Sequence, residues 1–144
     1  MIYWVFAFLA GAFLPLQVGL NKMVATVCSP LWATCLSFIV GVVAVITLTL
    51  ASRQPAPSMQ ELTALPAYVW IAGLLGLFYV FTVIVVGPKI GALMVMSLVI
   101  AGQLIASVLV DHFGAVGFPK HEITPGRIIG CLLILGGFLA IKKF

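Results

Sequence analysis

Five apolar stretches, each about long enough to cross a lipid bilayer, dominate this chain of 144 residues. A helix needs about 20 apolar residues to cross the hydrocarbon core. Only helices and closed barrels satisfy their backbone amides there, and continuous apolar runs do not fit the alternating pattern of barrel strands. The sequence therefore predicts an all-α integral membrane protein with five transmembrane helices in a single transmembrane domain, 1–144. The expected spans are about 2–20, 30–51, 66–86, 91–110 and 126–141, with polar loops at 52–65 and 111–125.

The composition excludes several classes of function. The chain is 64% hydrophobic and only 7% charged, so most of its surface must face lipid rather than water. Its basic residues form no cluster that could follow a phosphate backbone, so no nucleic acid is expected as a partner. Its three cysteines lack metal-ligand spacing, and no nucleophile elbow or phosphate-binding loop occurs. We therefore expect neither an enzyme nor a bound metal or cofactor.

The basic residues are divided almost evenly between the two sides of the membrane. With five spans, Arg53, Lys120 and Arg127 fall on the side of the N-terminus, and four lysines fall on the other side: Lys22, Lys89, Lys142 and Lys143. The positive-inside rule reads orientation from this balance, and a difference of one residue is a weak bias. The chain therefore either inserts in both orientations or takes one orientation for reasons other than charge.

Local signals mark several helix ends. Ser29–Pro30 and Thr124–Pro125 each predict an N-cap followed by proline in the first turn. Ser58 to Glu61 fits a capping box, which predicts a short helix in the loop 52–65. Two glycines, a proline and a lysine in 87–91 predict a tight turn between the third and fourth spans.

Polar residues within the spans are the candidate substrate-binding residues: Gln17, Asn21, Tyr79 and Gln103. Gln17 and Asn21 lie four residues apart, and Pro15 above them would make the first helix irregular. Such residues either form interhelical hydrogen bonds or line a polar cavity for a solute. Both readings stay open.

Small residues and a few charges complete the set of candidates. Gly126, Gly130, Leu133 and Gly137 form a seam on the fifth helix, which suits either packing within the chain or contact between chains, and Gly102 suits close packing. A second row, Ala33, Ser37 and Gly41, is interpreted as helix packing. Asp111 is a candidate proton or ion site, or else one partner of a structural pair at a helix end. Lys22 and Lys89 either reach lipid head groups or line an anion-attracting mouth.

Several short motifs, taken in order along nearly the whole chain, resemble the YdcZ-like family of the drug/metabolite transporter superfamily. They are Pro15-Leu16-Gln17 with Asn21, Ser29-Pro30-Leu31-Trp32-Ala33, Ser37-Phe38 with Gly41, Gly73 to Gly76 with Tyr79-Val80, Gly102-Gln103, and Asp111-His112-Phe113-Gly114. The resemblance implies a multi-pass protein of the bacterial inner membrane. It also implies half of a ten-helix transporter built from two inverted five-helix halves.

These expectations lead to one functional hypothesis and two alternatives. The hypothesis is a transporter of an unidentified small solute that works by alternating access as an antiparallel homodimer, surrounded by membrane lipid. An oppositely oriented homologous subunit could replace the second copy. The alternatives are a passive channel built from the same inverted dimer and a membrane scaffold or accessory subunit that transports nothing.

Overall fold

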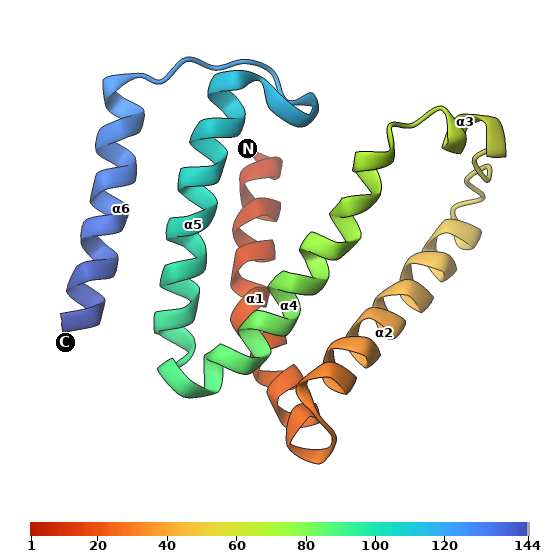
Figure 1. Ribbon diagram of the computed structural model, residues 1–144, viewed down its shortest axis with the longest axis horizontal. Helices are drawn as coiled ribbons and strands as arrows, with labels where there is room; N and C mark the ends of the chain where they lie inside the picture. Colours follow the sequence, from red (N-terminus) through yellow and green to blue (C-terminus); the bar gives the residue numbers. More distant parts are fainter. Residues whose placement is uncertain (144) are drawn as a thin grey trace. The chain divides into compact units, whose positions relative to one another are not determined.

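The computed structural model describes residues 1–143, and within that range every regular element is helical (Figure 1). The elements are α1 (Ile2–Val27), α2 (Pro30–Ala51), α3 (Met59–Thr63), η1 (Ala67–Trp70), α4 (Ile71–Ile90), α5 (Ala92–Phe113), η2 (Ala115–Gly117) and α6 (Pro125–Lys143). Five helical segments are long and apolar enough to cross a membrane. The predicted all-α architecture with five spans is therefore confirmed.

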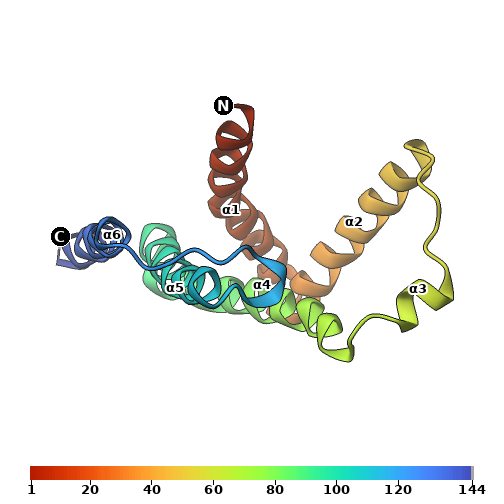
Figure 2. The same ribbon diagram turned by 90° about the horizontal axis from the view of Figure 1, so that it is seen from above.

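The chain divides into two compact units, one formed by Met1–Lys89 and one that starts at Ile90. In the N-terminal unit, α1 and α2 meet at their connection and spread apart toward their other ends (Figures 1 and 2). Helix α4 packs where the two converge, since Val80 and Ile84 form a buried cluster with Ala33 of α2. The core of this unit thus lies at the closed end of the α1–α2 hairpin.

The C-terminal unit is a second helical hairpin. Helices α5 and α6 lie side by side, joined by η2 and the segment 118–124 (Figure 1). An ion pair between Asp111 in the last turn of α5 and Arg127 in the first turn of α6 ties the helix ends at 3.1 Å.

The predicted helix caps are confirmed. Ser29 Oγ accepts a hydrogen bond from the Trp32 amide at 3.3 Å, and Thr124 Oγ1 accepts one from the Arg127 amide at 3.4 Å. Ser58 and Glu61 form the reciprocal capping box at the start of α3. Each cap satisfies an amide that has no partner within its own helix.

Several helix ends differ from the expected positions. Helix α4 continues to Ile90 with Pro88 inside it, so the predicted turn at 87–91 is wrong for all but its last residue. A proline crowds the Cβ of the preceding residue in a helix, and Gly87 has none. Gly91, with φ of 88°, makes the turn alone.

The helices of the first and fourth spans, α1 and α5, also run past the expected span ends. Helix α1 continues to Val27 and α5 continues to Phe113, which places Asp111 and His112 within a helix rather than a loop. Polar residues such as Asn21 and Lys22 end an apolar stretch without breaking the backbone hydrogen bonds of a helix.

The assignment of 1–144 to a single domain stays a prediction.

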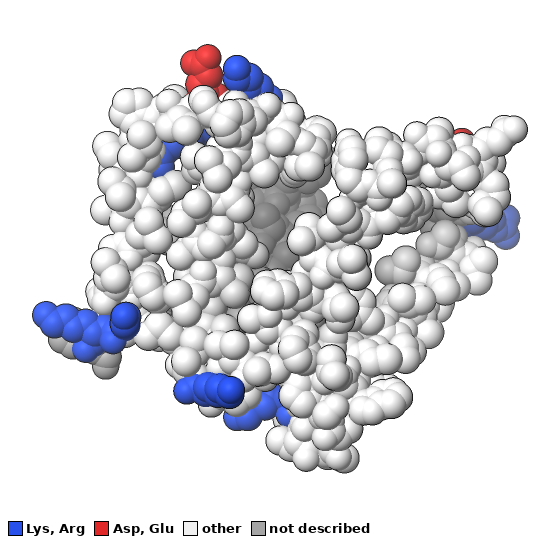
Figure 3. Space-filling view, viewed as in Figure 1, with Lys and Arg blue, Asp and Glu red and all other residues white. Residues whose placement is uncertain are grey.

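The chain itself leaves most of the apolar surface of its helices uncovered. Within the most apolar 18-residue window of each span, the buried share is 6%, 11%, 11%, 11% and 0% in chain order. Charged side chains gather at the helix ends, and the surface between those ends carries none in this view (Figure 3). This surface is available to lipid and to other protein chains.

Candidate functional site

The candidate site is a groove between α1 and α2 in the N-terminal unit. One part encloses about 510 Å³ and contains Gln17, Asn21 and Ser37. The adjoining part encloses about 450 Å³, shares Gln17 and Ser37, and reaches Gly41 of α2 and Val80 of α4. We refer to the two parts together as the inter-helix groove.

Three polar side chains face this groove from two helices. Gln17 and Asn21 lie one turn apart on α1, so their amides share a face of the helix. Ser37 faces them from α2. Gln17 is exposed, Ser37 is half-buried and Asn21 is only 8% exposed, so the polar lining extends from the surface into the unit.

Two buried polar atoms in this unit lack a hydrogen-bond partner among the described residues. They are the buried Nδ2 of Asn21, a residue that lines the groove, and the Tyr79 hydroxyl on α4. A buried polar group without a partner costs about 1–3 kcal/mol, and such groups often mark a site where a ligand or water supplies the missing bond. Asn21 is therefore the strongest single indication of a binding site.

The four predicted binding residues are only partly brought together. Gln17 and Asn21 line the same groove. Tyr79 packs against the cluster formed by Ala33, Val80 and Ile84, next to a groove-lining residue. Gln103 is exposed on α5 in the C-terminal unit. The binding role of all four stays a prediction.

Ser37 is a groove residue that the sequence reasoning missed. The row of Ala33, Ser37 and Gly41 was expected to pack helices, and Ala33 does so with 1% exposure. Ser37 and Gly41 instead line the groove, and a Cβ added at Gly41 would meet no atom within 4 Å. The sequence did contain a signal for this role. Ser37 is a hydroxyl residue within a row of small residues, and its helix follows the helix that carries the amides of Gln17 and Asn21.

The other candidate residues have clear positions. Pro15 lies inside α1, which continues through it. A Cβ added at Gly102 would meet no described atom within 4 Å. The same is true of the three glycines of the seam, which are Gly126, Gly130 and Gly137. Within the C-terminal unit these glycines do not pack closely.

The chemistry of the groove is hydrogen bonding. Among the residues that line it, none is ionisable, and the amides of Gln17 and Asn21 can both donate and accept. Most of the lining is apolar. Within residues 1–143, no group of three or more His, Cys, Asp or Glu could hold a metal ion. The groove therefore suits a small molecule with an apolar body and an uncharged polar group.

Comparison with known proteins gives one family. Residues 2–140 match the family model described as "Putative inner membrane exporter, YdcZ". The chain is also 30% identical over 141 residues to the inner membrane protein YdcZ of Escherichia coli strain K12, covering 95% of this chain and 94% of that protein. No solved structure matches the chain.

Proposed function

Because this chain belongs to the YdcZ family of inner membrane proteins, we propose that it carries a small solute across the inner membrane as an antiparallel homodimer. The family description names an exporter, which indicates a membrane transport protein rather than an enzyme. The proposed mechanism is alternating access. The proposed substrate is an uncharged amphipathic solute, because the inter-helix groove offers amides and apolar surface without charge.

The observation that carries this proposal is that Asn21 lines the groove while its buried Nδ2 has no hydrogen-bond partner among the described residues. Transporters place substrate sites within the membrane at irregular helices, where polar groups line a cavity. In α1, Pro15 lacks a backbone donor and lies two residues before Gln17 and six residues before Asn21. A solute that accepts a hydrogen bond from Asn21 Nδ2 would relieve the cost of that buried amide.

Three features support a second copy of the chain. The basic residues are balanced, with three on one side and four on the other, which favours insertion in both orientations. The α6 window is 0% buried, and Gly126, Gly130 and Gly137 have open space beside them. Small residues in such rows let helices of two chains approach closely in lipid.

An antiparallel pair also supplies a mechanism. Two copies inverted in the membrane plane carry grooves related by a two-fold axis in that plane, the symmetry that inverted-repeat transporters build within one chain. In one state of the dimer, one copy has its groove open to one side of the membrane and the other copy has its own groove closed. When the two copies exchange these conformations, the solute becomes exposed to the opposite side.

A ligand screen on the purified dimer in detergent tests the proposal. We expect an uncharged amphipathic metabolite to raise the melting temperature of the wild type, and Gln17→Leu to remove this rise. Gln54→Leu is the matched control, because Gln54 lies in the loop after α2. Uptake of that metabolite into proteoliposomes should then saturate with concentration. Stabilisation that survives Gln17→Leu and Asn21→Leu would contradict the site, and non-saturating flux would indicate a channel.

A further inference from the structure

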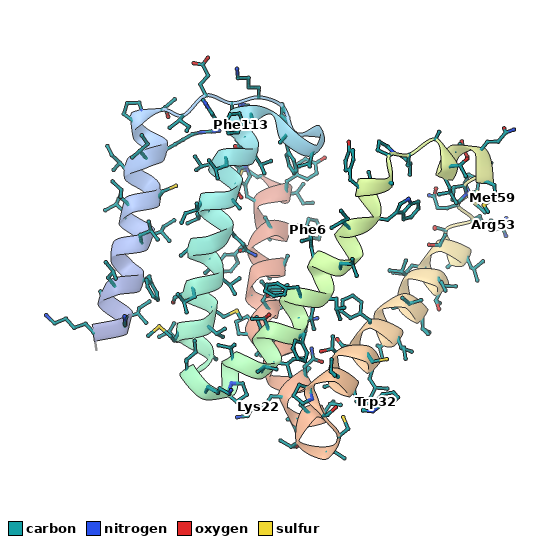
Figure 4. All side chains as sticks on the ribbon, viewed as in Figure 1. Phe6, Lys22, Trp32, Arg53, Met59 and Phe113 are labelled. Carbon is teal, nitrogen blue, oxygen red and sulfur yellow. The ribbon has the colours of Figure 1, made fainter. Side chains whose placement is uncertain are left out.

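Two lysines from different helices line a second pocket of the N-terminal unit. This pocket encloses about 300 Å³, and we call it the lysine pocket. Lys22 of α1 and Lys89 of α4 both line it. Figure 4 shows Lys22 at the end of the unit where α1 meets α2. The remaining lining is Ala25, Thr26, Pro30, Ile84, Val85 and Pro88.

Neither lysine has a counter-ion among residues 1–143, where the one ion pair joins Arg127 and Asp111. The acid of this unit, Glu61, is bonded to Ser58 at the start of α3, beyond the far end of α2. Helix α2 separates α3 from the pocket by roughly 33 Å at 1.5 Å per residue. Two like charges that share a pocket without an acid repel each other, and an anion between them removes that repulsion.

The surroundings add to the positive potential. Pro30, the first residue of α2, lines the pocket, so the positive end of that helix dipole faces it. By the alternation of the five spans, this side of the membrane carries four lysines and no acid, and the other side carries all three acids. The lysine pocket therefore lies at the positive end of the protein.

We propose that Lys22 and Lys89 form a binding site for a phosphate group at the membrane surface. Lysine ammonium groups bind phosphate as point charges, and basic pockets between membrane helices bind the head groups of acidic lipids. The apolar remainder of the lining would face the first part of an acyl chain. The site shares no lining residue with the inter-helix groove, so it does not depend on the proposed transport function.

Thermal unfolding of delipidated protein in neutral detergent tests the site. One arm adds phosphatidylglycerol, a second adds phosphatidylcholine, and a third adds inorganic phosphate at constant ionic strength. We expect phosphatidylglycerol to raise the melting temperature of the wild type by about 2–4 °C. The rise should at least halve in Lys22→Gln and in Lys89→Gln and vanish in the double variant. A rise with inorganic phosphate, lost in the same variants, supports the site with a soluble phosphate as its ligand.

Lys142→Gln is the matched control, since it removes the same charge from the same predicted side of the membrane in the other unit. It should keep the full response. The double Lys→Arg variant keeps both charges and should also respond, which covers the case in which the double Gln variant does not fold. Native mass spectrometry should show a bound phosphatidylglycerol in the wild type and in the Lys→Arg variant. An equal response to phosphatidylcholine, an equal loss in Lys142→Gln, or no response to either phosphate source would overturn the proposal.

Discussion

Arg127 Nη1 donates to Asp111 Oδ2 at 3.1 Å and so joins the first turn of α6 to the last turn of α5. The backbone of Asp111 has a second role, because its carbonyl accepts a hydrogen bond from the His121 amide at 2.7 Å. The pair is partly exposed, with 39% of the Arg127 side chain and 31% of the Asp111 side chain accessible. Asp111 thus holds both the first turn of α6 and the connection at His121 to the end of α5.

The ion pair should make a small but measurable contribution to stability. A double-mutant cycle with Arg127→Gln and Asp111→Asn should give a coupling of about 0.2–1 kcal/mol, as for other exposed pairs. Reversible denaturant unfolding in mixed micelles measures it, and Lys120→Gln serves as a control in the same connection. If Asp111 also carries a proton or an ion, Asp111→Asn will abolish concentrative transport while Arg127→Gln retains it. Equal transport in both variants would contradict that role.

Asn21→Leu should stabilise the protein without solute and impair its function. The leucine replaces a buried amide that has no partner, and such a replacement returns about 1–3 kcal/mol of unfolding free energy. Solute-dependent stabilisation and transport should both fall. Thr34→Val is the control, because Thr34 is also buried, at 1% exposure, but donates to the Pro30 carbonyl at 2.8 Å. Lower stability in Asn21→Leu, with transport intact, would indicate a purely structural amide.

Orientation should respond to a few added charges. In the wild type, reporters fused to the C-terminus should be active on both sides of the membrane, because the basic residues differ by only one. Gln54→Lys with Gln60→Lys adds two charges to the loop 52–65. The balance changes from three against four to five against four in favour of the side of that loop, so the share of chains with the C-terminus outside should rise. The matched control replaces both glutamines by asparagine. A single orientation that the added lysines do not change would argue against a homodimer of inverted copies.

Gly137→Leu should weaken the dimer without unfolding the chain. A Cβ added at Gly137 meets no described atom within 4 Å in its own unit, and we expect the second chain to pack at this position. We expect the dimer dissociation constant to rise at least tenfold, about 1.4 kcal/mol, in a fluorescence energy transfer assay between labelled copies. Gly136→Leu is the neighbouring control, since that position is equally open but lies off the seam. Equal effects at both positions would reject the seam as the interface.

The short helix α3 should depend on pH through Glu61. Hydrogen bonds from the Ser58 backbone amide at 2.7 Å and the Ser58 hydroxyl at 2.8 Å lower the pKa of Glu61 below its usual value of 4.5. A lowered pKa in the folded state adds stability that is present above the unfolded pKa and is lost as the pH falls through the folded pKa. Helix α3 should therefore fray in acid.

Ser58→Ala should raise the pKa of Glu61, because the hydroxyl donor is lost while the backbone donor remains. The chain has two glutamates, Glu61 and Glu122, so a protein labelled at glutamate Cδ gives two signals in an NMR titration. Ser52→Ala is the control, since the Ser52 hydroxyl donates to the Thr49 carbonyl instead. An unchanged Glu61 midpoint in Ser58→Ala would show that the hydroxyl does not hold the carboxylate.

The sequence allowed the helices to be predicted better than their ends. Long apolar runs admit few structures in lipid, and capping residues such as Ser29 and Ser58 act within a few residues of themselves. The end of α1 was misplaced because Asn21 and Lys22 end the apolar run but continue the helix. The turn predicted before α5 began too early in the sequence, because Gly87 lets Pro88 remain within α4.

For the candidate site, the sequence allowed us to predict only which residues lie together on one helix. The pairing of Gln17 with Asn21 follows from their spacing of four residues. The position of Ser37 opposite these two residues cannot be derived from sequence spacing, because it depends on how α2 meets α1.

By itself, then, the sequence determined the class of protein, the five membrane helices and the positions of the polar and charged residues along them. Hydropathy and capping are local properties, and they suffice for this. Only the tertiary structure decided which of those residues lie together within each unit. It placed Ser37 opposite Gln17 and Asn21, Arg127 beside Asp111, and Lys22 and Lys89 around one pocket. Helices with nearly uniform apolar surfaces can pack in many ways, so the sequence pattern alone leaves these neighbours undetermined.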